Sequence, residues 1–187
     1  MSDKESPDDV SLRGILKSQF ETAWSLLSYH LEGLSDEECA WRPEPQGLHV
    51  HADPSGGWRP DWPDRETYDL GPPSIAWTSW HILYWWTNAL RGVHGELPLD
   101  PGHVEWPGEV ADAVVAIEGF RMRWLAVLDR DRDFAEPLVA SWPLPSSSLA
   151  GIAAWLNIEL AKNAAEIGYA RFLHGARSAS EPRHWAG

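Results

Sequence analysis

Apolar residues recur at three- and four-residue spacing in four segments of the chain, a pattern typical of amphipathic helices. The four segments cover approximately residues 10–34, 75–91, 109–128 and 148–174. No stretch shows the alternation of apolar and polar residues that would predict a β-strand. Because each helix has an apolar side that must be covered, the pattern predicts an all-α fold in which four long helices form a bundle.

The segments between these helices are long and rich in proline and glycine. The longest, residues 42–73, joins the first and second helices, and its prolines remove backbone hydrogen-bond donors and break helices. Trp58 and Trp62 indicate that this loop packs back onto the domain, since disordered segments rarely keep such side chains. We expect a disordered tail over residues 1–9, one helical domain over residues 10–176 and a second tail over residues 177–187.

Composition changes this picture mainly by excluding partners. The 187 residues carry a formal net charge of −13, which argues against binding to nucleic acid or to anionic lipid. No apolar window of about 18 residues is present, so we expect no segment to span a membrane. The polar, acidic start is unlike a signal peptide, and a single cysteine, Cys39, fits a reducing compartment. We therefore expect a cytoplasmic protein.

Three polar residues of the last predicted helix lie among apolar ones. At 100° per residue, Glu159, Asn163 and Glu166 fall on the same side as Trp155 and Leu156. A buried carboxylate without a partner is strongly destabilising. This stripe therefore requires a cation, a hydrogen-bonding partner or protonation in the core.

The second helix supplies a partner for this stripe. His81 shares its side of the helix with Trp77, Tyr84 and Trp85, and the opposite side is also apolar, so we expect this helix in the interior and His81 in the core. Imidazole and carboxylates on facing helices of a bundle are the materials of a metal site. The same residues also make a metal-free polar network, and the spacing leaves both interpretations open.

Three further histidines are candidates for the polar cluster or for a second metal site. His30 falls on the core side of the first helix and is a candidate to join the polar cluster. His49 and His51 in the long loop are either a second metal-binding pair or ordinary loop polarity.

Three segments together resemble the DinB-like superfamily, and the resemblance covers about residues 10–175. The segments are Gly33-Leu34-Ser35-Asp36-Glu37-Glu38 with Trp41-Arg42-Pro43, Ser74-Ile75-Ala76-Trp77 with Trp80-His81-Ile82, and Trp155-Leu156-Asn157-Ile158-Glu159-Leu160 with Asn163-Ala164-Ala165-Glu166-Ile167-Gly168. The resemblance implies an up-down-down-up four-helix bundle with the long Pro/Gly/Trp-rich loop between helices one and two, frequently as a homodimer.

The resemblance also implies a divalent metal, Zn²⁺ or Ni²⁺, held by His81, Glu159 and Asn163. Asn163 departs from the family pattern, which usually has histidine at that position. Glu166 and His30 would then support the ligands through hydrogen bonds. The walls of an apolar pocket would come from Trp77, Tyr84, Trp85 and Trp155.

Such a site implies a metal-dependent enzyme that acts on a small molecule. The family's activities include thiol transfer, thiol-dependent isomerisation and hydrolysis, through a metal-bound thiolate or water whose pKa the cation lowers. Glu159 matches a ligand position that is glutamate in the mycothiol-dependent maleylpyruvate isomerases. The Trp-rich, acidic composition resembles family members that use mycothiol, which would then be the co-substrate. The alternative, motivated by Asn163, is a metal-free small-molecule-binding or stress-response module.

Overall fold

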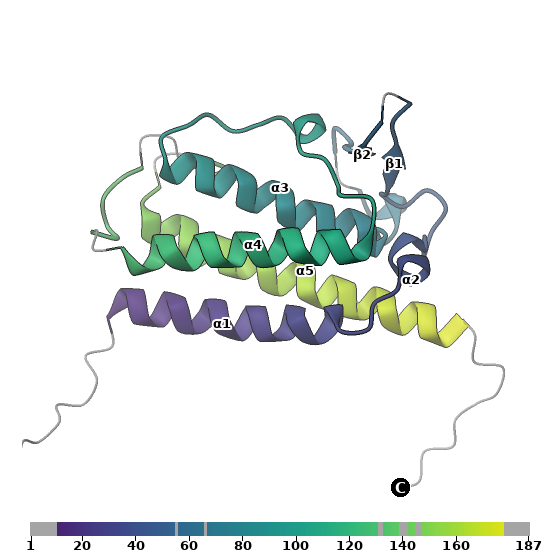
Figure 1. Cartoon of the computed structure of the whole chain (residues 1–187), viewed down its shortest axis with the longest axis horizontal. Helices are drawn as coiled ribbons and strands as arrows, with labels where there is room; N and C mark the ends of the chain where they lie inside the picture. Colours follow the sequence, from purple (N-terminus) through teal and green to yellow (C-terminus); the bar gives the residue numbers. More distant parts are fainter. Residues whose placement is uncertain are drawn as a thin grey trace, which may run out of the picture.

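The computed structural model describes residues 11–54, 56–65, 67–130, 133–138, 142–144 and 147–177. Four long helices make up most of these residues: α1 (Leu12–Leu31), α3 (Ile75–Val93), α4 (Val110–Asp129) and α5 (Leu149–Arg177). They lie side by side, with α5 against α1 and α3, and α4 against α3 and α1 (Figure 1). The described part of the chain is thus mostly helical, which confirms the predicted all-α class in its coarse form.

Serine caps set the starts of α1 and α3, at Ser11 and Ser74. The hydroxyl oxygen of Ser74 accepts a hydrogen bond from the backbone N–H of Trp77 at 3.2 Å, as expected for the residue before α3. The first helix ends at Leu31, earlier than predicted, because Gly33 takes a left-handed φ of 67°. A fifth, short helix follows, α2 (Asp36–Ala40), which is not among the four predicted helices.

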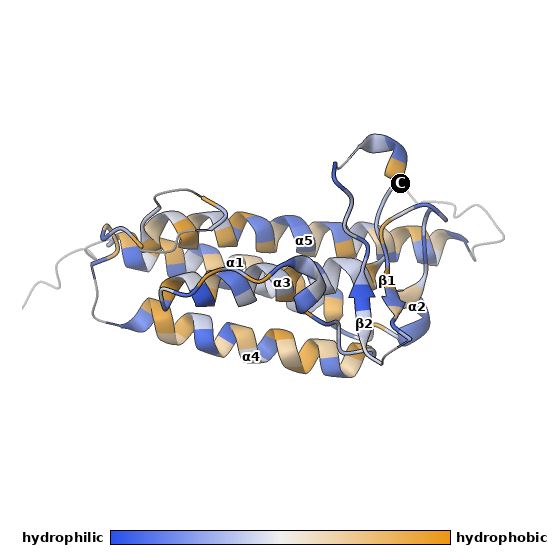
Figure 2. Cartoon of the chain, turned by 90° about the horizontal axis from the view of Figure 1, so that it is seen from above, coloured by the Kyte–Doolittle hydropathy of each residue, from blue (hydrophilic) through white to orange (hydrophobic). Residues whose placement is uncertain are grey.

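The long loop contains a small antiparallel sheet of β1 (Val50–Ala52) and β2 (Trp58–Pro60), in which Val50 pairs with Pro60. The expectation that the chain has no strand is therefore wrong here. Three-residue strands are too short for alternation to be visible in the sequence. The left-handed Gly56 and Gly57, with φ of 95° and 87°, turn the chain between them. The hairpin stands at one end of the helices, near α2 (Figures 1 and 2).

Large aromatic side chains fill the core between the helices. Phe20, Trp80, Trp86 and Trp124 are at most 1% exposed. The helix α3 is buried on nearly all sides, as its two apolar faces predict, whereas α4 and α5 alternate between hydrophobic and hydrophilic residues (Figure 2). Among the described residues, no helix is long and apolar enough to cross a membrane. The predicted tails lie almost wholly outside the described residues, although Arg177 still belongs to α5.

Candidate functional site

His81 lies in the middle of α3 and is only 3% exposed. Its Nδ1 is 3.1 Å from Oδ1 of Asn163 on α5. The indole N–H of Trp85, one turn further along α3, lies 2.5 Å from Nε2, the nearer of the two ring nitrogens. The imidazole also stacks on Trp77, with ring centroids 4.8 Å apart. Both ring nitrogens of His81 are therefore engaged by uncharged side chains.

These contacts assign one tautomer to His81. An indole N–H can only donate a hydrogen bond, so Nε2 accepts from Trp85 and carries no proton. Nδ1 then carries the proton and donates a hydrogen bond to the amide oxygen of Asn163. The available lone pair of the imidazole is thus already used within the protein.

The surroundings also keep His81 uncharged. Burial and the nearby Lys162 ammonium lower the pKa of His81 from 6.5 to about 3, although the hydrogen bond to Asn163 acts in the opposite direction. At neutral pH the ring is therefore a hydrogen-bonding group without charge.

Glu159, the second predicted ligand, lies beside a positive charge. Its side chain is 18% exposed, and Lys162 Nζ lies 3.0 Å from its Oε2. This contact is an ion pair without the geometry of a hydrogen bond. The buried Oε2 of Glu159 therefore has no hydrogen-bond donor in the described part of the chain. Glu159, Asn163 and Trp85 border a cavity of about 10 Å³, at the lower limit for one water molecule.

The donor set does not fit a resident zinc or nickel ion. The lone pair of His81 is taken by Trp85, and Glu159 lies against Lys162. Asn163 offers only a neutral amide oxygen, which is a weak ligand beside imidazole or thiolate. Within the residues that the structure describes, no three His, Cys, Asp or Glu side chains are grouped to hold a metal ion. A metal would bind only after Trp85 and Lys162 had withdrawn.

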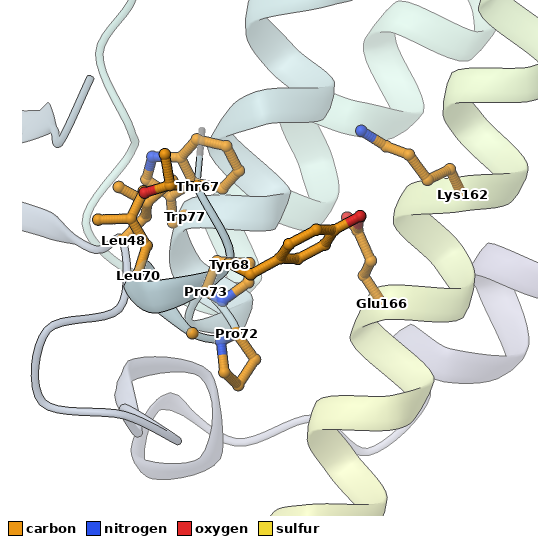
Figure 3. Close-up of a pocket in the computed structure, with 10 residues that line it drawn as sticks. Leu48, Thr67, Tyr68, Leu70, Pro72, Pro73, Trp77, Lys162 and Glu166 are labelled. Carbon is orange, nitrogen blue, oxygen red and sulfur yellow. The ribbon is translucent and has the colours of Figure 1, made fainter. Parts of the chain in front are cut away.

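A cavity of about 660 Å³ opens next to this polar cluster. Trp77, which stacks on His81, forms part of its wall, and Lys162 and Glu166 form the side that α5 contributes (Figure 3). The remaining wall comes from Leu48, Thr67, Tyr68, Leu70, Gly71, Pro72 and Pro73. Figure 3 shows the ring of Tyr68 extended across the opening toward Glu166. The long loop thus closes one side of the cavity and α5 the other.

Of the four residues predicted to line a pocket, Trp77 lines this cavity, and the other three form an aromatic layer beside His81. Tyr84 stacks on Trp80, and Trp155 packs edge-on against Trp85 with ring centroids 4.7 Å apart. The rings that contact the imidazole itself are Trp77, Trp80 and Trp85, and together they contribute to its burial.

The remaining predicted histidines lie elsewhere. His30 borders a separate cavity of about 390 Å³, near Arg171 and Gly168. His49 Nδ1 is 2.7 Å from the hydroxyl of Ser74. His51 Nε2 lies 3.0 Å from both carboxylate oxygens of Asp61. His30 also packs edge-on against Tyr29, so each of these histidines makes its contacts away from His81.

Two residues at the site were missed by the sequence analysis. Lys162 follows Glu159 by three residues and precedes Glu166 by four, a spacing that places all three on adjacent positions of one helix surface and predicts an ion contact. Tyr68 carries no comparable signal, because it begins a three-residue 3-10 helix (Tyr68–Leu70) whose place depends on the path of the long loop.

Comparison with known families finds that the DinB superfamily matches residues 19–167, which is most of the chain and includes α3, α4 and the polar positions of α5. Comparison with curated proteins and with solved structures finds no significant match. The family resemblance seen in the sequence is confirmed, and it extends to no particular activity, metal or substrate.

Proposed function

Because the chain belongs to the DinB superfamily, we propose that it binds a small molecule in the 660 Å³ cavity and does so without a resident metal ion. The observation that carries this proposal is the cavity itself, which lies against the His81 cluster and is large enough for a small organic ligand.

The lining of the cavity indicates the kind of ligand. Trp77, Leu70 and the two adjacent prolines offer an apolar wall, while Lys162 and Glu166 place one positive and one negative group on the opposite side. An amphipathic molecule with an aromatic or aliphatic body and a polar end fits this division. The aromatic ring of Tyr68, fully exposed at the opening, is placed to cover the bound molecule.

The His81 cluster has a supporting role in this proposal. Its hydrogen bond to Asn163 joins α3 to α5, its hydrogen bond from Trp85 orients the ring within α3, and its stacking on Trp77 holds that side chain in place. A satisfied polar network of this kind fixes the relative position of two helices. In the same proposal, α1, α3, α4 and α5 are the up-down-down-up four-helix bundle of the superfamily, and the cavity lies between the bundle and its long loop.

An anionic, aromatic probe tests the binding site. We expect anilinonaphthalene sulfonate to bind and to shift the indole N–H resonance of Trp77 in an NMR spectrum. Lys162→Met removes the ammonium from the wall and should weaken binding about fivefold, equal to about 1 kcal/mol. Lys17→Met is the matched control, because Lys17 also forms an exposed ion pair, with Asp129, but lies far from the cavity.

Two results would contradict the proposal: equal effects of the two lysine substitutions, or a probe that leaves the Trp77 resonance unmoved. Tyr68→Ala is a second test. Because this side chain is fully exposed, its removal should weaken binding of the probe without changing the stability of the protein.

A second candidate is the metal-dependent thiol transferase, thiol-dependent isomerase or hydrolase implied by the family, with Zn²⁺ or Ni²⁺ and mycothiol. The buried Oε2 of Glu159, which has no hydrogen-bond donor among the described residues, favours it. It predicts that zinc or nickel raises the melting temperature of the wild-type protein and not that of His81→Gln. The metal-free proposal predicts no such difference and no effect of either metal on probe binding.

A further inference from the structure

Another cavity lies between the C-terminal parts of α3 and α4, at the end of the molecule away from the hairpin (Figure 1). Its volume is about 490 Å³, and it shares no lining residue with the 660 Å³ cavity. Trp77 of that cavity and Arg91 of this one are about 20 Å apart along α3 at ~1.5 Å per residue. The two cavities are therefore separate sites.

The lining of this cavity is positively charged, in contrast to the chain as a whole. Arg91, Arg123 and Arg130 border it together with a single carboxylate, that of Glu96, whereas the whole chain carries a formal net charge of −13. Guanidinium groups stay protonated in proteins, so these like charges repel each other across the cavity. An anion bound among them would replace this repulsion by attraction. The excess of positive charge thus indicates an anionic ligand.

Arg123 is held in position by its neighbours. Its Cζ lies 4.1 Å from the ring centroid of Phe120, and its Nε donates a hydrogen bond to the carbonyl oxygen of Gly119. Phe120 in turn packs against the buried Trp86, with ring centroids 6.3 Å apart. The two Nη groups of Arg123 have no hydrogen-bond partner among the described residues. The core thus positions a guanidinium fork, which matches the geometry of two phosphate oxygens.

Arg130 and His94 offer further groups that the chain does not use. The side chain of Arg130 has no hydrogen bond or ion pair in the described part of the chain. His94 Nδ1 lies 2.6 Å from the carbonyl oxygen of Leu90 and donates to it, which leaves Nε2 without a partner there. Arg91 differs, because its Nη1 lies 2.7 Å from Oε2 of Glu96. A carboxylate of the chain therefore holds one of the three arginines and leaves the other two.

Arginines near a helix end often stabilise its last carbonyl groups. In α3 the backbone does this, because the N–H groups of His94, Gly95 and Glu96 donate to carbonyls of the last turn. In α4 the backbone N–H of Arg130 donates to the carbonyl of Val127 in the same way. The guanidinium groups are therefore not needed as caps, and attraction to the helix dipole does not explain why they border one cavity.

We propose that this cavity binds the phosphate group of a small phosphate monoester. Such a group carries a charge of about −1.5 to −2 near pH 7 and has three acceptor oxygens, so it can engage the guanidinium groups of both Arg123 and Arg130. A carboxylate, with one negative charge, would neutralise only one of them. This inference does not depend on the ligand proposed for the 660 Å³ cavity.

The rest of the lining indicates the body of the ligand. Leu90, Phe120 and Val127 give the cavity an apolar side next to the arginines. A volume of about 490 Å³ is within the range of sites for small organic molecules, so it has room for more than a phosphate group. An aromatic or aliphatic body carried by the phosphate fits this apolar side.

Calorimetric titration of the full chain with phenyl phosphate tests the proposal. At about 0.15 M NaCl, where exposed charges interact only over about 8 Å, we expect a dissociation constant below about 1 mM. Inorganic phosphate should bind about tenfold more weakly, because it lacks a ring to contact Leu90 and Phe120. Arg123→Gln and Arg130→Gln should each weaken phenyl phosphate about tenfold, because each removes a charged hydrogen-bond donor.

Arg177→Gln is the matched control. Arg177 also stacks on an aromatic ring, that of Trp41, but it contacts Glu37 of α2, near the hairpin end of the molecule (Figure 1). This variant should bind phenyl phosphate as wild type does. Circular dichroism of all three variants should remain helical, so that a loss of affinity is not a loss of the fold.

Methyl NMR distinguishes the two cavities. Phenyl phosphate should shift the methyl resonances of Leu90 and Val127, and should leave those of Leu48 and Leu70 in the 660 Å³ cavity unmoved. The opposite pattern of shifts would overturn the proposal. So would the absence of binding up to about 10 mM phenyl phosphate, or an equal loss of affinity in Arg177→Gln and Arg123→Gln. Inorganic phosphate that binds as tightly as phenyl phosphate would overturn the assignment of a monoester.

Discussion

The neutral state of His81 predicts how acid destabilises the protein. In the unfolded chain the imidazole has a pKa of about 6.5, and in the folded protein burial and Lys162 lower it to about 3. Between these values the unfolded state binds a proton that the folded state does not. The contribution of His81 to stability is therefore complete above pH 6.5 and is lost as the pH falls toward 3.

The size of the effect follows from the two pKa values. Each unit of pH within this range removes about 1.4 kcal/mol from the free energy of unfolding. Between pH 7 and pH 5 the loss due to His81 alone should be about 2 kcal/mol. His81→Gln is the matched variant, because a glutamine amide can accept from Trp85 and donate to Asn163 but does not titrate.

Urea unfolding of both proteins at pH 7 and pH 5, in the presence of EDTA, gives the measurement. The wild-type protein should lose about 2 kcal/mol more than His81→Gln over this interval, since carboxylates contribute equally to both. Equal losses in the two proteins would refute the assignment of His81 as a buried, neutral imidazole. In the same experiment, an NMR titration of wild type should show no protonation of this ring above pH 4.

Three further substitutions test contacts outside the His81 cluster. Gly47→Ala should lower the free energy of unfolding by about 1–3 kcal/mol, because the Cβ of the new alanine would lie 2.4 Å from the carbonyl oxygen of Pro72 in the cavity wall. Gly102→Ala is the control and should be nearly neutral, because a Cβ added there meets nothing within 4 Å. Arg171→Met should lower the free energy of unfolding in urea by about 1–3 kcal/mol, because the guanidinium of Arg171 donates hydrogen bonds to the carbonyls of His30 and Glu32 and to the carboxylate of Glu38. An unchanged urea midpoint would contradict this expectation. Ser74→Ala should cost about 1 kcal/mol through loss of the cap of α3, whereas Ser25→Ala, on the exposed side of α1, should change little.

The helices could be predicted from the sequence because each has an apolar side with a regular period. Ser74 and the prolines before it fixed the start of α3, and the two apolar faces of that helix indicated its interior position. The hairpin could not be predicted, since its strands have three residues each and are held by the turn at Gly56 and Gly57. Periodicity needs more residues than these strands contain.

The candidate site shows a similar limit. Helical spacing places His81 and Asn163 on facing sides of two helices, and the structure brings them to 3.1 Å. The same spacing says nothing about the cavity, whose second wall is an irregular loop that includes Tyr68 and Leu70. Side chains of such a loop are positioned by tertiary contacts, so no local pattern in the sequence marks them.

The difference between a metal site and a polar network depends here on a single lone pair. His81 could ligate an ion only through Nε2, and this atom accepts the indole N–H of Trp85, a residue of the same helix four positions on. Residues at i and i+4 are neighbours on a helix surface, so α3 itself brings the indole N–H within reach of the imidazole. A metal at Nε2 would have to displace this buried hydrogen bond, and Asn163, whose weak amide oxygen lies against Nδ1, is on the other side of the ring. Trp85→Phe removes the competing N–H and keeps most of the ring packing against Trp155. If the competition explains the absence of a fitting donor set, this variant should bind zinc more tightly than wild type in calorimetric titration. Equal zinc affinities of the two proteins would show that Asn163 and Lys162, and not Trp85, limit metal binding.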